Sequence, residues 1–250
     1  MIKRLLSLFS LLLISLITPP LSAAQNTQAL SIELIGKGQT LQFKQKKRLE
    51  QVLKLAQERQ VILQYPLAVT LFDNSTLALQ KTTVLKNSVL NQMVQYNLAG
   101  HPLYKFIQQN HFAPRVMSGI DFDAIRLDKR KNPLLAGNFA LSAPLRKEMV
   151  LYLGNIDGIY TVKNQAGVAL DNQLVSLQKT INSDSKQPPI LIYPDGNIAR
   201  PQYGSWLNSK YYLPPLTIVY FPFEGFEGSQ MDRDIIKLLS QHRPTSSKND

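Results

Sequence analysis

The chain contains no cysteine among its 250 residues. This absence excludes disulfide bonds, thiolate metal sites, cysteine nucleophiles and a lipid anchor attached to a cysteine behind a leader. Tryptophan is nearly as scarce, since Trp206 is the only one. The fold must therefore be held together by its apolar core alone.

Acidic residues are also few, with 17 Asp and Glu against 28 Lys and Arg, which gives a formal net charge of +11. Such a balance favours anionic partners. The first 24 residues, described below, predict an export leader, so anionic polysaccharide or anionic lipid headgroups fit the expected compartment better than nucleic acid. We therefore expect no nucleic-acid partner. The alternative is that the charge only keeps the protein soluble.

The leader occupies residues 1–24. Lys3 and Arg4 precede an apolar run over 5–17, and the small residues Ser22, Ala23 and Ala24 follow it. This order is typical of a secretory signal peptide, which we expect to be cleaved after Ala24. The apolar run is shorter than the roughly 20 residues that a bilayer span needs.

Motifs of the common enzyme classes are missing. The sequence has no Walker loop, no Rossmann glycine triplet, no Gly-x-Ser-x-Gly elbow and no His-Glu-x-x-His. His101 and His111, with Asp121 and Asp123 further on, are predicted at a helix break and a helix end, where histidine usually bonds an unpaired carbonyl. We therefore expect no catalytic residue, no metal and no cofactor.

Asp121 and Asp123 are the one pair of carboxylates that suggests catalysis. In a strand over 120–128 they would share a face and could act as acid and base on a glycosidic bond. The neighbouring Arg126 and Lys129 favour the ionised forms of both carboxyls. A solvated ion-pair edge is the preferred interpretation, and a glycan hydrolase remains the alternative.

The first half predicts a β-grasp unit that carries a helical insertion. It begins with two alternating strands around Gly36-Lys37-Gly38 and a helix with apolar residues at helical spacing. Gly100-His101-Pro102 breaks the later helical region into a hairpin. The expected elements are strands at 30–43, 61–65, 68–72, 115–117, 120–128 and 137–141, a helix at 46–60 and helices within 76–112.

The second half repeats this outline. Its expected elements are strands at 149–153, 158–162, 190–193 and 216–221, and a helix at 173–181. We predict an α+β fold of two tandem β-grasp domains, with the boundary at Ala143-Pro144. The domains cover 25–145, with a helical hairpin inserted at about 75–112, and 146–226.

A C-terminal amphipathic helix is predicted over 229–242, followed by a disordered tail over 243–250. Met231, Ile235, Leu238 and Leu239 fall at i, i+4, i+7 and i+8 and form one apolar stripe. The preferred interpretation is that the stripe docks on the second domain. Docking on a membrane or on a partner protein is the alternative.

Arg115 is the strongest candidate for a binding residue. It follows Pro114 at a junction between helix and strand, where a guanidinium can bind a carboxylate or phosphate bidentately. The alternative is a structural arginine that caps the helix ending near Phe112. Tyr203 and Trp206, from a late cluster of aromatics, and Arg126 complete the candidates for glycan or partner binding.

Several short motifs resemble the GfcC family of capsule biosynthesis proteins. They are YPDG at 193–196, SWLN at 205–208, LPP at 213–215 with the strand to Phe223, the terminal MDRDIIKLLSQHRP, and PRV at 114–116 with IDFDAIRL after it. Two positions depart from the family pattern, since Leu216 and Pro222 stand where relatives often have glycine.

The resemblance implies a soluble periplasmic protein similar to outer-membrane polysaccharide export proteins, with tandem SLBB-like β-grasp domains. It implies a non-enzymatic role in export or assembly of capsule or O-antigen-like polysaccharide. The expected partner is an acidic surface polysaccharide or an outer-membrane export component, with membrane-proximal contact through the C-terminal helix and a monomeric state. By the same resemblance, Arg115 matches an arginine that lies at a crevice.

Overall fold

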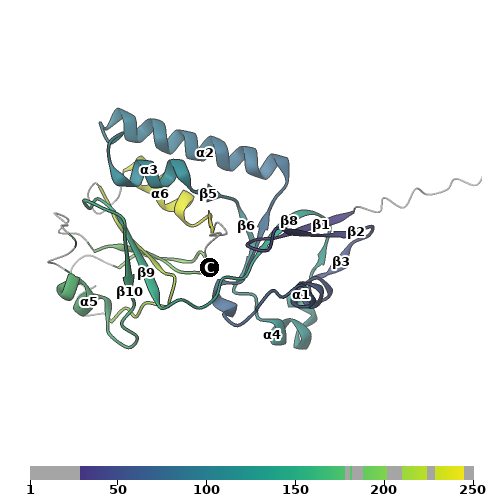
Figure 1. The fold of residues 1–250 in the computed structure, drawn as a ribbon. Helices are drawn as coiled ribbons and strands as arrows, with labels where there is room; N and C mark the ends of the chain where they lie inside the picture. The colour runs from purple at the N-terminus through teal and green to yellow at the C-terminus, as the bar shows by residue number, and fades with distance from the viewer. Residues whose placement is uncertain (1–28, 178–180, 182–187, 202–209, 224–228, 245–250) are drawn as a thin grey trace, which may run out of the picture.

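The computed structural model describes residues 29–177, 181, 188–201, 210–223 and 229–244. The predicted leader at 1–24, the candidates Tyr203 and Trp206, and the predicted tail from 245 onward lie outside these residues. The described part contains two five-stranded sheets and six α-helices, in agreement with the predicted α+β class (Figure 1). No helix in it is long and apolar enough to cross a bilayer.

The first sheet has the strand order β2-β1-β8-β4-β6. Its strands are β1 (Leu30–Leu34), β2 (Gln39–Phe43), β4 (Thr70–Asp73), β6 (Arg115–Ser118) and β8 (Gly137–Ser142). β1 and β8 are parallel and the other neighbours are antiparallel. Burial alternates along β1, because one face of the sheet packs on α1 (Leu49–Glu58) and α4 (Phe122–Leu127).

The second sheet repeats this order as β10-β9-β13-β11-β12, with β9 and β13 parallel and the other neighbours antiparallel. Its strands are β9 (Met149–Gly154), β10 (Tyr160–Lys163), β11 (Ile190–Ile192), β12 (Ile198–Ala199) and β13 (Ile218–Phe221). All four residues of β13 are buried, because α5 (Leu170–Leu177) covers one face of the sheet and a helical layer covers the other.

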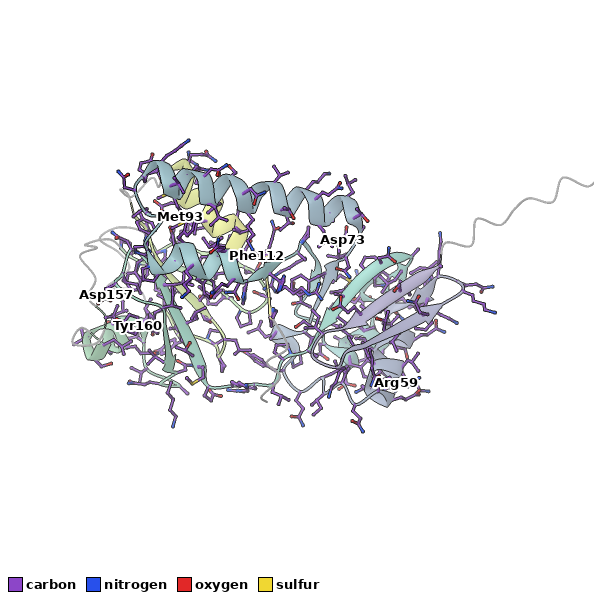
Figure 2. The ribbon with its side chains drawn as sticks, turned by 45° about the horizontal axis from the view of Figure 1, so that its top comes forward. Arg59, Asp73, Met93, Phe112, Asp157 and Tyr160 are labelled. Atoms are coloured by element: carbon purple, nitrogen blue, oxygen red, sulfur yellow. The ribbon has the colours of Figure 1, made fainter. Side chains whose placement is uncertain are left out.

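The helical layer consists of α2 (Thr76–Gln95), α3 (Pro102–Gln109) and α6 (Gln230–Leu239). Ser75 begins α2 by accepting a hydrogen bond from the Ala78 amide. Figure 1 shows α2 running from the first sheet across to the second, with α3 and α6 beneath it. Met93 and Phe112, labelled in Figure 2, pack in this layer against residues of α6 and the second sheet. The hairpin thus joins the two halves of the molecule.

Two short strand pairs and two 3-10 turns complete the fold. β3 (Lys47–Arg48) pairs with β7 (Leu134–Leu135), and β5 (His111–Phe112) pairs with β14 (His242–Arg243). The turns are η1 (Pro66–Ala68) and η2 (Lys129–Lys131). The terminal helix, expected to reach residue 242, ends at Leu239. Arg243, expected in a disordered tail, lies in β14 and forms an ion pair with Glu33.

The structure corrects the predicted strand over 120–128, which forms the helix α4 instead. The Asp121 carboxylate caps this helix by accepting hydrogen bonds from the amides of Asp123 at 2.9 Å and Ala124 at 3.2 Å, and Ile125 is buried beneath it. Residues 61–65 also form no strand and lead into η1. The helix expected at 173–181 begins earlier, at Leu170, as α5.

Candidate anion-binding crevice between the sheets

Arg115 is the first residue of β6, and an irregularity in the sheet fixes where its side chain goes. The register of β4 and β6 shifts between Leu71 and Phe72, so that Phe72 lies opposite Arg115. The guanidinium lies over the Phe72 ring, with its carbon 5.3 Å from the ring centroid. The side chain is thereby directed to the space between the two sheets.

Three hydrogen bonds hold the guanidinium. Nε donates to the Ser240 carbonyl at 2.7 Å, and Nη1 donates to the Pro194 carbonyl at 2.7 Å and to Thr70 Oγ1 at 3.0 Å. Ser240 is the C-cap of α6, so the cation lies at the negative end of that helix. Arg115 thus caps α6, and not the helix ending near Phe112, and it joins the first sheet to the second half of the chain.

The positive charge of Arg115 has no counterion within the described residues. Burial lowers the pKa of Arg115 from 12.5 to about 10, and the carboxylate of Asp195 offsets part of this effect from a distance. All three acceptors are neutral, and in the described part of the chain Nη2 donates no hydrogen bond. Since a partly buried cation without a counterion is less stable than a paired one, an anion bound at Nη2 would be favoured.

A cavity of about 260 Å³ lies beside this side chain. It opens between the two sheets, and most of its wall is apolar. The residues that line it are Ala68, Thr70, Phe72, Arg115, Ser142, Pro144, Met149, Val150, Leu151, Thr161, Ile192, Tyr193, Pro194, Leu216, Ile218, Leu239, His242 and Pro244. The crevice can therefore take a group that is negatively charged at one end and apolar along its body.

His242 contributes to the wall of the cavity as a neutral side chain. Burial, together with the charges of Arg115 and His111, lowers its pKa to about 4. Nε2 lies 3.1 Å from Asn110 Oδ1, and the ring packs edge-on to Phe112 at 5.8 Å between centroids. At neutral pH the wall beside Arg115 therefore gains no second positive charge from this histidine.

The turn at 193–196 packs closely against the side chain of Arg115. Gly196 has φ +86°, and a Cβ atom at this position would lie 2.8 Å from Arg115 Cδ and 3.2 Å from the Ser240 carbonyl oxygen. The site therefore needs glycine here both for backbone conformation and for space. In the sequence this turn stands out only as one of the motifs that resemble the GfcC family.

Leu216, which also lines the cavity, is a second residue with a positive φ angle. It has φ +66°, a left-handed conformation that costs a non-glycine residue about 1–2 kcal/mol. Its amide donates to the Met149 carbonyl at 2.7 Å, which fixes the turn before β13. Strain of this kind often collects at binding sites.

Of the other candidates within the described residues, Leu239 lines the cavity and the rest lie apart from it. Arg126 is on α4 with its side chain 58% exposed, and it faces Asp123 at 3.8 Å in a surface ion pair. The stripe of α6 is buried in the helical layer. Its members are Met231, Ile235, Leu238 and Leu239. No group of three potential metal ligands occurs among the described residues.

A buried carboxylate also attaches α6 to the second sheet. Asp232 is 1% exposed and accepts hydrogen bonds from the Tyr220 hydroxyl and, at 3.0 Å, from the Phe223 amide. Burial and this carboxylate raise the pKa of Tyr220 well above 10, so the phenol remains the donor. The helix is thus fixed by a polar contact as well as by its apolar stripe.

Residues 26–144 match the family model described as capsule biosynthesis GfcC, N-terminal. Residues 26–144 are thus a domain of the GfcC family. The GfcC domain spans the first sheet and the helical hairpin, and it supplies Arg115, Thr70 and Phe72 to the crevice. Membership links the protein to capsule biosynthesis. No curated protein matches the chain.

Proposed function

We propose that this GfcC-family protein is a periplasmic, non-enzymatic accessory protein for export or assembly of capsule or O-antigen-like surface polysaccharide. It acts by binding an anionic group of an export-machinery component in the crevice at Arg115. The observation that carries the proposal is a half-buried guanidinium that has only neutral acceptors among the described residues and lies beside a cavity of about 260 Å³.

The wall of the crevice favours a protein partner over an acidic sugar. A uronic acid carries several hydroxyl groups, each of which loses hydration unless it meets a polar partner. Side chains such as Met149, Val150 and Ile192 offer none. A carboxylate flanked by apolar side chains, as at the end of a peptide segment, would satisfy Arg115 and bury apolar surface together.

The fold supports the same proposal. The recurrence of one strand order and one parallel pair in both sheets favours two tandem β-grasp, SLBB-like domains, the first with an inserted helical hairpin. The leader at 1–24 favours the periplasm. The buried stripe of α6 favours a helix that stabilises a monomer.

The experiment compares three variants in a strain that lacks the protein. Arg115→Met removes the charge, Arg115→Lys keeps a charge without the planar fork, and Arg126→Met is a matched control at an exposed arginine. We expect wild type and Arg126→Met to restore surface polysaccharide, and Arg115→Met to fail at equal protein levels.

A pull-down from periplasm and outer membrane, made with the same variants, identifies the ligand class. Loss of a specific protein from Arg115→Met alone supports the proposal. If polysaccharide is lost instead and every protein is retained, the crevice binds glycan. If Arg115→Met restores surface polysaccharide fully, the crevice has no role in export.

A further inference from the structure

A second surface, on α4, η2 and the β3–β7 pair, combines exposed leucine with basic side chains. We call it the basic-leucine patch and define it by Arg48, Leu127, Lys129, Arg130, Lys131 and Leu134. Figure 1 shows α4 with α1 on the opposite side of the molecule from α2, so the hairpin does not cover this region.

The geometry of α4 forces Leu127 outward. Successive residues of a helix are turned by about 100°, so Leu127 lies nearly opposite Ile125. Ile125 is 3% exposed in the core beneath α4, whereas Leu127 is 88% exposed. A single exposed leucine is ordinary on a protein surface, and its surroundings decide whether it has a role.

Exposed basic residues lie on the elements that follow this leucine and on the strand paired with them. η2 follows α4 after one residue and presents Lys129, Arg130 and Lys131 to solvent. The pairing of β3 with β7 sets Arg48 opposite Leu134, which is 53% exposed, and Arg48 Nη1 donates to the Asn132 carbonyl at 3.0 Å.

The acidic residues of this region are already engaged. Asp128 accepts two hydrogen bonds from the Arg130 guanidinium, and Glu50 accepts one from the Asn132 side chain. Lys129 and Lys131 have no ion-pair partner among the described residues. The patch therefore has a net positive charge around two exposed apolar side chains.

We propose that the basic-leucine patch binds the surface of an anionic phospholipid bilayer. Leu127 and Leu134 enter the boundary between headgroups and acyl chains, while the basic side chains meet lipid phosphates. An acidic polysaccharide would neutralise the same charges but would give the leucines nothing to bury in, and the leucines therefore favour lipid.

The test is co-flotation of the mature protein with phosphatidylcholine vesicles that contain or lack phosphatidylglycerol. Because each basic side chain near an anionic surface contributes about fivefold, changing Lys129, Arg130 and Lys131 to Gln should weaken binding to anionic vesicles about a hundredfold. The matched control changes three exposed lysines elsewhere, Lys81, Lys105 and Lys163, and should change binding only a few-fold.

A second variant pair separates lipid from polyanion. Leu127→Ser should weaken anionic-vesicle binding about tenfold and leave binding to polygalacturonate unchanged, whereas Leu77→Ser, at a residue 63% exposed on α2, should change neither. Equal binding to neutral and anionic vesicles would overturn the proposal. So would a Leu127→Ser variant that binds anionic vesicles as wild type does, since the patch would then bind polyanions by charge alone.

Discussion

Replacement of Arg115 by Met should cost less than about 1.5 kcal/mol of unfolding free energy. The lowered pKa, about 10 against 12.5, means that holding the charge in the crevice costs about 3 kcal/mol at neutral pH. Three hydrogen bonds to neutral acceptors offset this cost. Each contributes roughly 1.5 kcal/mol, because water can reach the acceptors through the cavity when the bond is lost. Methionine loses these bonds, removes the desolvation cost and fills much of the same volume.

Urea unfolding followed by far-UV circular dichroism measures this difference. Arg115→Ala is the useful comparison, because it also removes the packing of the aliphatic stem and should cost about 2 kcal/mol more than Arg115→Met. A loss above about 3 kcal/mol for Arg115→Met would refute the reasoning. Arg115 would then be chiefly a clamp between the sheets, retained for stability and not for a ligand.

Three further predictions concern neighbouring residues. Burial and the charge of Arg115 lower the pKa of His242 to about 4 in the folded state, below the value of 6.5 in the unfolded state. The unfolding free energy is therefore at its full value above pH 6.5 and should fall by about 3 kcal/mol as the pH drops to 4. Urea midpoints measured across this pH range test the prediction, and His242→Gln should flatten the profile. Leu216→Gly should raise the melting temperature by relieving about 0.5 kcal/mol of net strain, and a fall would contradict the strain argument. Asp232→Asn should lower the unfolding free energy by about 2–4 kcal/mol through the contact with Tyr220, measured by urea unfolding, with unchanged stability as the contrary result.

Local patterns predicted much of the first half of the fold. Alternation of apolar residues in β1 and helical spacing in α1 each report a single buried face, and both elements formed. The same reasoning failed over 120–128. The apolar residues Ile120 and Phe122 are two apart, which is the spacing of a strand. Phe122 and Ile125, however, are three apart, which is the spacing of a helix, and Asp121 caps that helix. The cap and the helical spacing decided the structure of this segment.

The sequence singles out Arg115 as a candidate, but it could not predict the side chains and carbonyls around it. Thr70, Pro194 and Ser240 are 45, 79 and 125 residues away along the chain. Two of these acceptors are backbone carbonyls, which any residue type supplies, so composition and motif carry no information about them. Only the packing of the second half against the first brings them together.

The joining of the hairpin to α6 bears on how the chain is made. β1 must wait for β8, since Leu30 pairs with Gly137, and the apolar faces of α2 and α3 are covered by the second sheet and by the last helix, Gln230–Leu239. A nascent or truncated chain that lacks this helix would expose Met93 and Leu103 to proteases and chaperones. We therefore expect late, slow and all-or-none folding, in which the C-terminus completes the core of a segment synthesised more than a hundred residues earlier.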